Sequence, residues 1–194
     1  MKQIKSMLPI LLVVTGLAVY FIQRPHAFYG TPIDPPYPAQ NFTLASAAGP
    51  VSFVDFRGKL VVVYFGYTFC PDVCPATLAK LTEVLKKLSA QAADVQILMV
   101  SLDPERDTPE RLEEYLAHFD PSFIGITGTR DQLDLITAAN DIFYEKKPGS
   151  SPDNYSIDHT TSLLVFDREL NLVLLIPFES TPDQVADDLK YLLK

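Results

Sequence analysis

The sequence predicts an α/β domain preceded by a single transmembrane helix. Two patterns predict the domain: from Asn41 onward, short apolar runs alternate with amphipathic helical segments, and turn or cap residues separate them. The helix is predicted by an uncharged stretch of 18 residues between Lys5 and Arg24. With 194 residues, 47% of them hydrophobic, the chain can form one domain with its own core.

Residues 1–24 are predicted to be an uncleaved membrane anchor. As a helix the uncharged stretch would span about 27 Å, close to the hydrocarbon thickness of a bilayer. Lys2 and Lys5 precede it, which predicts a cytoplasmic N-terminus and a body on the periplasmic side of a bacterial cytoplasmic membrane. A cleaved signal peptide is the alternative, with the small-residue triplet Gly16-Leu17-Ala18, but the apolar run continues past it.

Residues 25–40 are predicted to be a proline-rich extended spacer, because Pro25–Pro38 contains five prolines. The folded domain is then expected over residues 41–194. Its predicted strands are Phe42–Leu44, Val51–Asp55, Leu60–Phe65, Val95–Leu102, Phe123–Thr127, Ile142–Lys146, Thr161–Phe166 and Leu170–Ile176. Its predicted helices are Ala76–Leu88, Pro109–Phe119, Asp131–Ala139 and Asp183–Leu193.

Cap residues support the predicted helix starts. Proline follows a proposed N-cap in Cys74-Pro75, Thr108-Pro109 and Thr181-Pro182, where its missing N–H costs nothing. Thr129 and Thr181 each have glutamine three residues later, as in a capping box. A central sheet with crossover helices, a late β-hairpin and a final helix is the thioredoxin-like pattern. The prediction is therefore a thioredoxin-like fold with an N-terminal β-hairpin and an inserted polar loop, Lys147–Asp158, that leads to a histidine.

The charge of the chain excludes nucleic acid as a partner. Beyond Arg24 the chain carries 13 basic and 24 acidic residues, a net charge of −11, which repels a polyanion.

The two cysteines, Cys70 and Cys74, are the main functional signal. They follow the apolar strand Leu60–Phe65 at the start of a helix, and open α/β sheets bind ligands at such strand ends. A helix N-terminus favours an anion, so the pKa of Cys74 is expected to be lowered. The pair could form a reversible redox disulfide, or its two thiolates could share a soft cation, for which Cu(I) is the best match. A purely structural disulfide would close too few residues to stabilise the chain much.

A two-thiolate metal site usually needs a third donor, and the chain has three histidines. His26 lies in the proposed spacer and is expected to be solvated. His118 lies near a helix C-terminus, where a histidine interacts favourably with the free carbonyl groups. His159 lies in a loop that leads into a buried strand and can be either a ligand or a surface residue.

Three motifs in order make the chain resemble the Sco/SenC/PrrC family of membrane-anchored, thioredoxin-like copper proteins. They are Cys70-Pro71-Asp72-Val73-Cys74-Pro75, Asp103-Pro104-Glu105-Arg106-Asp107-Thr108-Pro109 and Asp158-His159-Thr160, and the resemblance covers roughly residues 40–194. It implies that Cys70, Cys74 and His159 bind one copper ion, Cu(I) or Cu(II). Zinc accepts the same donors, but a structural zinc site wants four protein ligands and only three are found.

The resemblance also implies a function and partners. The leading hypothesis is a metallochaperone that delivers copper to the binuclear copper site of a respiratory cytochrome c oxidase, with the copper-bearing oxidase subunit as its partner. The alternatives are an exported thiol–disulfide oxidoreductase, which keeps the oxidase cysteines reduced, and a redox or copper sensor. Another copper chaperone or a thioredoxin-like reductant could be a further partner. The acidic loop Asp103–Thr108 is expected to be a well-hydrogen-bonded turn, with a role in shaping the copper site as the alternative.

Overall fold

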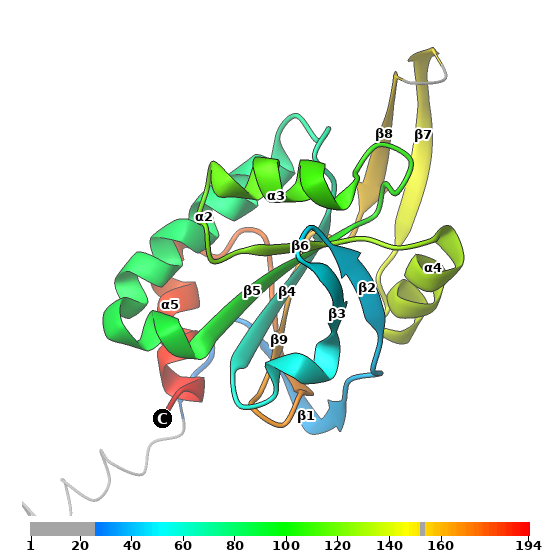
Figure 1. The fold of residues 1–194 in the computed structure, drawn as a ribbon. Helices are drawn as coiled ribbons and strands as arrows, with labels where there is room; N and C mark the ends of the chain where they lie inside the picture. Colours follow the sequence, from blue (N-terminus) through cyan, green and yellow to red (C-terminus); the bar gives the residue numbers. More distant parts are fainter. Residues whose placement is uncertain (1–25, 152–153) are drawn as a thin grey trace, which may run out of the picture.

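The computed structural model describes residues 26–151 and 154–194, and its centre is a mixed six-stranded sheet (Figure 1). The strand order is β1-β10-β9-β4-β5-β6, in which β4 pairs in parallel with β5, and β5 with β6, while the other pairs are antiparallel. The bounds are β1 (Thr31–Pro38), β4 (Leu60–Gly66), β5 (Val95–Ser101), β6 (Ile124–Ile126), β9 (Leu163–Phe166) and β10 (Asn171–Ile176). The mixed α/β, thioredoxin-like prediction is confirmed.

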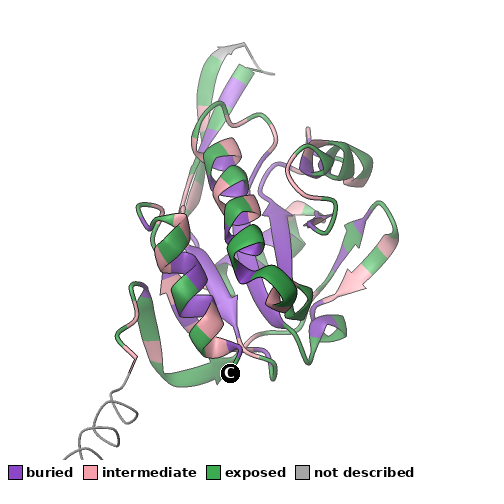
Figure 2. Cartoon of the chain, turned by 90° about the vertical axis from the view of Figure 1, so that its left-hand side faces the viewer, coloured by how far each residue is buried: buried purple, intermediate pink, exposed green. Residues whose placement is uncertain are grey.

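The helices cover the sheet and bury its central strands. They are α2 (Val73–Leu88), α3 (Pro109–Ala117) and α5 (Pro182–Leu192); α2 contacts α5, and α3 contacts β6. A fourth helix, α4 (Arg130–Ala139), lies at the edge of the domain (Figure 1). Every residue of β4 and β5 is buried, as expected for parallel strands covered on both faces. Figure 2 shows these buried strands behind helices whose outer surfaces are exposed.

Three of the predicted helix caps are confirmed. The side chains of Thr108, Thr129 and Thr181 each accept a hydrogen bond from the backbone N–H three residues later. The cap proposed at Cys74 is wrong, because α2 already begins at Val73 and its N-cap is Asp72. Cys74 therefore lies inside the first turn of the helix.

Two hairpins lie outside the main sheet. The first, β2 (Thr43–Ser46) and β3 (Gly49–Ser52), is followed by the 3-10 helix η1 (Phe53–Phe56), and confirms the predicted N-terminal hairpin. A second 3-10 helix, η2 (Ser89–Asp94), leads into β5.

The second hairpin, β7 (Tyr144–Ser151) and β8 (Asn154–His159), corrects the predicted polar loop over Lys147–Asp158. It projects from one end of the domain (Figure 1). In β8, Tyr155 and Ile157 are buried while Ser156 and Asp158 are exposed, so the strand has a period of two. The prediction of a loop came from the many polar residues of the segment and from the proline and glycine of β7.

The N-terminal part of the described chain also corrects a prediction. Residues 31–38, assigned to the spacer, form the edge strand β1, which pairs antiparallel with β10 and shifts register between Pro32 and Tyr37. Prolines are tolerated there because an edge strand leaves one row of N–H groups unpaired. His26 is not solvated: its ring stacks on Tyr191 at 4.3 Å, and its Nε2 lies 3.3 Å from Asp188 Oδ1.

The anchor predicted over residues 1–24 lies outside the described residues. Within the described ranges, no helix has the length and apolar character to cross a bilayer.

Candidate metal centre

The segment between β4 and α2 brings Cys70 and Cys74 together at the carboxyl end of a buried strand. Cys74 is completely buried, whereas Cys70 is partly exposed. The backbone N–H of Cys74 donates a hydrogen bond of 3.4 Å to Cys70 Sγ. No side chain caps α2, so the Cys70 sulfur accepts from an N–H group that would otherwise lack a partner at this helix end.

Buried neighbours determine where the Cys74 sulfur lies. The Tyr64 hydroxyl donates to Cys74 Sγ over 3.2 Å, and Tyr64 is itself fully buried. Gly66 provides the space: a Cβ at that position would lie 3.1 Å from Cys74 Sγ and 2.7 Å from the Tyr64 ring. At the end of β4, Tyr64 therefore provides a hydrogen bond to the Cys74 sulfur and Gly66 provides the space for it, whereas the sequence shows only an apolar run there.

The last residue of β8, His159, reaches the cysteines from a distant part of the chain. Its Nε2 lies 3.7 Å from Cys74 Sγ, and its ring meets the rings of Tyr64 and Tyr67 edge-on, with centroids 6.1 and 6.0 Å away. Its other nitrogen, Nδ1, lies 2.9 Å from the carbonyl oxygen of Thr160. A carbonyl can only accept, so Nδ1 carries the proton and Nε2 presents its lone pair to the sulfur side.

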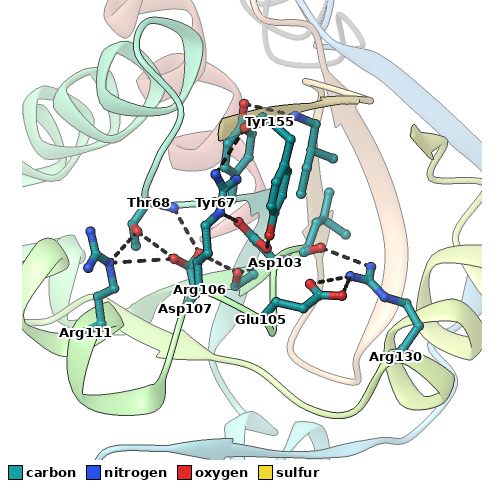
Figure 3. Close-up of polar contacts among 12 residues, drawn as sticks. Tyr67, Thr68, Asp103, Glu105, Arg106, Asp107, Arg111, Arg130 and Tyr155 are labelled. Atoms are coloured by element: carbon teal, nitrogen blue, oxygen red, sulfur yellow. Dashed lines mark hydrogen bonds and ion pairs between the residues drawn. The ribbon is translucent and has the colours of Figure 1, made fainter. Parts of the chain in front are cut away.

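The acidic loop after β5 holds the segment that leads to Cys70. Asp107 is fully buried and accepts from the Thr68 N–H at 2.9 Å, from the Thr68 hydroxyl at 2.5 Å and from the Ser101 hydroxyl at 2.6 Å. Figure 3 shows Asp107 directed at Thr68, two residues before Cys70. The loop is the hydrogen-bonded turn that was expected, and Asp107 connects it by hydrogen bonds to the segment that carries Cys70.

The two thiols have opposite pKa shifts. The hydrogen bond from the Cys74 side chain is the main reason why the pKa of Cys70 is lowered to about 3. Burial opposes this lowering, and hydrogen bonds from the backbone N–H groups of Asp72 and Cys74 add to it. The same bond to Cys70, followed by burial, raises the pKa of Cys74. The expectation of a lowered pKa at Cys74 is therefore wrong: the pKa of Cys70 is lowered, chiefly by the hydrogen bond that Cys74 donates to it.

The donor set fits one soft metal ion. A metal about 2.3 Å from a thiolate and about 2.0 Å from an imidazole separates the two donors by roughly 3.7 Å in a trigonal arrangement. Cys74 Sγ and His159 Nε2 are 3.7 Å apart. Across the described ranges, no three cysteine, histidine or acidic side chains are arranged so that they could already hold a metal ion together.

A hollow of about 340 Å³ opens beside these side chains and is lined by Cys70, His159 and residues 71–73 and 156–158. The other two histidines lie elsewhere: His118 is the exposed C-cap of α3, and His26 packs on α5. The sequence analysis missed the roles of Tyr64, Gly66 and Thr160. Tyr64 and Gly66 lie at the end of β4, before the turn that carries Cys70, and Thr160 follows His159, but only three-dimensional contact reveals what they do.

Comparisons with known proteins agree with this geometry. A family model described as SCO1/SenC matches residues 31–194. A SCO2-like protein of Rickettsia felis is 36% identical over 152 residues, which cover 77% of this chain and 74% of that protein. The solution structure of apo Sco1 from Thermus thermophilus has a TM-score of 0.79 and 39% identity, covering 86% of this chain and 98% of that one. ScoI of Bradyrhizobium japonicum, solved with copper bound, has a TM-score of 0.73 and 34% identity, covering 79% and 98%. The motifs, the fold and the matched residues together establish that this chain belongs to the SCO1/SenC family.

Proposed function

We propose that this chain is a copper metallochaperone that binds one copper ion through Cys70, Cys74 and His159. The approach of His159 Nε2 to Cys74 Sγ, at 3.7 Å, is the observation that carries the proposal. Thiolate and imidazole donors suit copper, and the copper-bound relative at 34% identity supports this choice of metal. The recipient that we propose is the binuclear copper site of a respiratory cytochrome c oxidase during its assembly.

Some side chains orient the donors that would bind the ion, and the exposure of Cys70 would allow its release. Tyr64 and the bond from Nδ1 to the Thr160 carbonyl orient two donors, while the raised pKa of Cys74 means that its thiol gives up a proton when copper binds. Cys70 is partly exposed beside the hollow, so an acceptor's thiolate can approach the ion from that side. A site that is half open suits transfer better than permanent storage.

Copper titration of the reduced protein tests the ligand set. Cys70→Ser, Cys74→Ser and His159→Ala should each weaken binding at least about a hundredfold, since water replaces each donor poorly. His118→Ala is the matched control, because His118 is exposed at the end of α3 and should leave binding unchanged. Equal affinity of His159→Ala and the wild type for both Cu(I) and Cu(II) would exclude the three-donor site.

Delivery is tested in cells. A strain that lacks the protein should lose oxidase activity, and added copper should restore it at least in part. Complementation with His159→Ala should restore less activity than complementation with His118→Ala. A deletion strain with normal oxidase activity in low copper would exclude delivery to the oxidase.

A thiol–disulfide oxidoreductase is the second candidate, favoured by the unequal cysteines. In that reaction the Cys70 thiolate attacks a partner disulfide and one partner sulfur leaves as a thiolate. Cys74 then attacks Cys70, its proton passing to a released thiolate, so the partner is reduced and the pair becomes a disulfide. Catalytic reduction of insulin by the metal-free protein, together with full oxidase assembly in the His159→Ala strain, would favour this function over copper delivery.

We further propose that residues 1–24 anchor the domain at the periplasmic face of a bacterial cytoplasmic membrane. The first described residues and the C-terminus lie at the end of the domain opposite the β7–β8 hairpin (Figure 1). This placement would direct the hairpin away from the bilayer. Fractionation of cells, with protease added to spheroplasts, should find the protein in the membrane and digest its domain. Protection from protease would exclude the proposed orientation.

A further inference from the structure

The loop after β5 contacts both segments that carry the proposed ligands. Asp107 binds Thr68, two residues before Cys70, through two hydrogen bonds. Asp103 and Arg106 of the same loop contact Tyr155, four residues before His159. Figure 3 shows Asp103 and Arg106 directed at Tyr155 on one side of the loop and Asp107 at Thr68 on the other. One short loop therefore connects the cysteine-bearing turn to the histidine-bearing strand.

Asp103 and Arg106 hold Tyr155 through three contacts. Its hydroxyl donates to Asp103 Oδ1 over 2.5 Å, and Asp103 is fully buried. The Arg106 Nε donates to the second oxygen of Asp103, while its Nη1 donates to the Tyr155 carbonyl at 3.1 Å. The Arg106 guanidinium also lies 3.5 Å from the centre of the Tyr155 ring. These contacts hold both the side chain and the backbone of Tyr155.

The geometry of a strand carries this restraint to His159. Side chains at every second residue point to the same side, so Tyr155, Ile157 and His159 form one row on β8. The Ile157 N–H donates to the Tyr67 hydroxyl at 3.2 Å, which ties the middle of the row to the cysteine-bearing turn. His159 is the end of the row, and its orientation toward Cys74 depends on where the two residues before it are held.

We propose that Asp103 and Arg106 are positioning residues that, through Tyr155, hold β8 so that His159 lies over the two cysteines. This inference rests on the proposed copper function, because positioning matters only if His159 is a ligand. Asp103 and Arg106 act on the strand that presents the donor, through their contacts with Tyr155. Loosening this contact should therefore lower copper affinity only while His159 is present.

Tyr155→Phe is the variant that tests the proposal, because it removes one hydroxyl and keeps the ring under Arg106. Tyr115→Phe is the matched control, since the buried Tyr115 hydroxyl has no hydrogen-bond partner among the described residues. Both changes are made in the wild type and in His159→Ala. A hydrogen bond to a charged group is strong enough that its loss should weaken copper binding about tenfold in the wild-type background. In the His159→Ala background the same change should alter affinity less than about twofold.

Two further measurements separate positioning from simple stability. The nitrogen coupling of bound Cu(II), seen by electron paramagnetic resonance, should weaken in Tyr155→Phe and stay unchanged in Tyr115→Phe. In the reduced, metal-free protein, amide hydrogen exchange of residues 154–159 should rise about tenfold in Tyr155→Phe. This second readout does not depend on copper.

The outcomes are distinct. Equal losses of copper affinity with and without His159, or faster exchange with unchanged affinity, would overturn the positioning role while leaving copper binding intact. Failure of the wild type to take up copper would instead remove the proposed function. In that case unchanged exchange in Tyr155→Phe would also refute the hold on β8, and faster exchange would support it.

Discussion

The partly exposed thiol of Cys70 is expected to react as a thiolate far below the pH at which an ordinary cysteine does. Its pKa is lowered to about 3, chiefly by the hydrogen bond from Cys74, whereas a free cysteine has a pKa of about 8.5. Between about pH 4.5 and pH 8 Cys70 should therefore be ionised throughout. Its alkylation rate should be nearly constant over this range, while that of an ordinary thiol rises about tenfold per pH unit.

The assay follows alkylation of the reduced, metal-free protein by iodoacetamide, with mass spectrometry to separate the peptide positions of the two cysteines. The slope against pH is the diagnostic quantity, because a thiolate of low pKa is also a weaker nucleophile and its absolute rate is modest. Cys74 should react slowly at every pH, since it is completely buried.

Cys74→Ala removes the largest of the effects that lower the Cys70 pKa, so the rate in this variant should again rise with pH. His118→Ala is the control and should keep the flat profile. If the alkylation rate of wild-type Cys70 rose tenfold per pH unit from about pH 5 to pH 8, Cys70 would not have the lowered pKa, and the assignment of the remaining proton to Cys74 would be refuted.

Three further perturbations have clear directions. Gly66→Ala should lower the free energy of unfolding by about 1–3 kcal/mol in a denaturant titration, because its Cβ would lie 2.7 Å from the Tyr64 ring; unchanged stability would contradict this packing. Burial raises the pKa of Glu105, but hydrogen bonds from Arg130 bring this pKa below its usual value. The ionised carboxylate therefore stabilises the fold above the unfolded pKa of about 4.3, and this stabilisation is lost as the pH falls through the lowered pKa of the folded state. Glu105→Gln should thus cost about 0.5–1 kcal/mol at pH 7, a modest amount because the pair is half exposed. The deficit should shrink as the pH falls through the lowered pKa, and a deficit independent of pH would exclude the ion pair as its source. Copper at about a hundredfold excess over its Kd should raise Tm by about 5–10 °C, and a similar rise in Cys74→Ser would mean that the ion binds elsewhere.

Much of the fold could be predicted because its signals are local. The apolar runs of β4 and β5 identify buried parallel strands without any knowledge of their neighbours. The threonine caps at residues 108, 129 and 181 mark helix starts through bonds that span only three residues. The position of the two cysteines at the end of β4 follows from the same local reading.

The predictions from local sequence were wrong where pairing with another segment decides the structure. Residues 31–38 have the composition of a spacer, yet they form β1 because β10 provides an edge that tolerates their prolines. Residues 147–158 look like a polar loop, but β7 and β8 pair with each other and bury Tyr155 and Ile157.

The candidate site divides in the same way. The sequence by itself determined which donors the chain possesses: two cysteines at a strand end and three histidines, one of them beside a strand. Only the tertiary structure placed His159 within 3.7 Å of Cys74, across 85 residues of chain, and lowered the pKa of Cys70 rather than that of Cys74. The physical reason is that distance, burial and proton sharing depend on which groups come together in space, and local sequence patterns do not specify that.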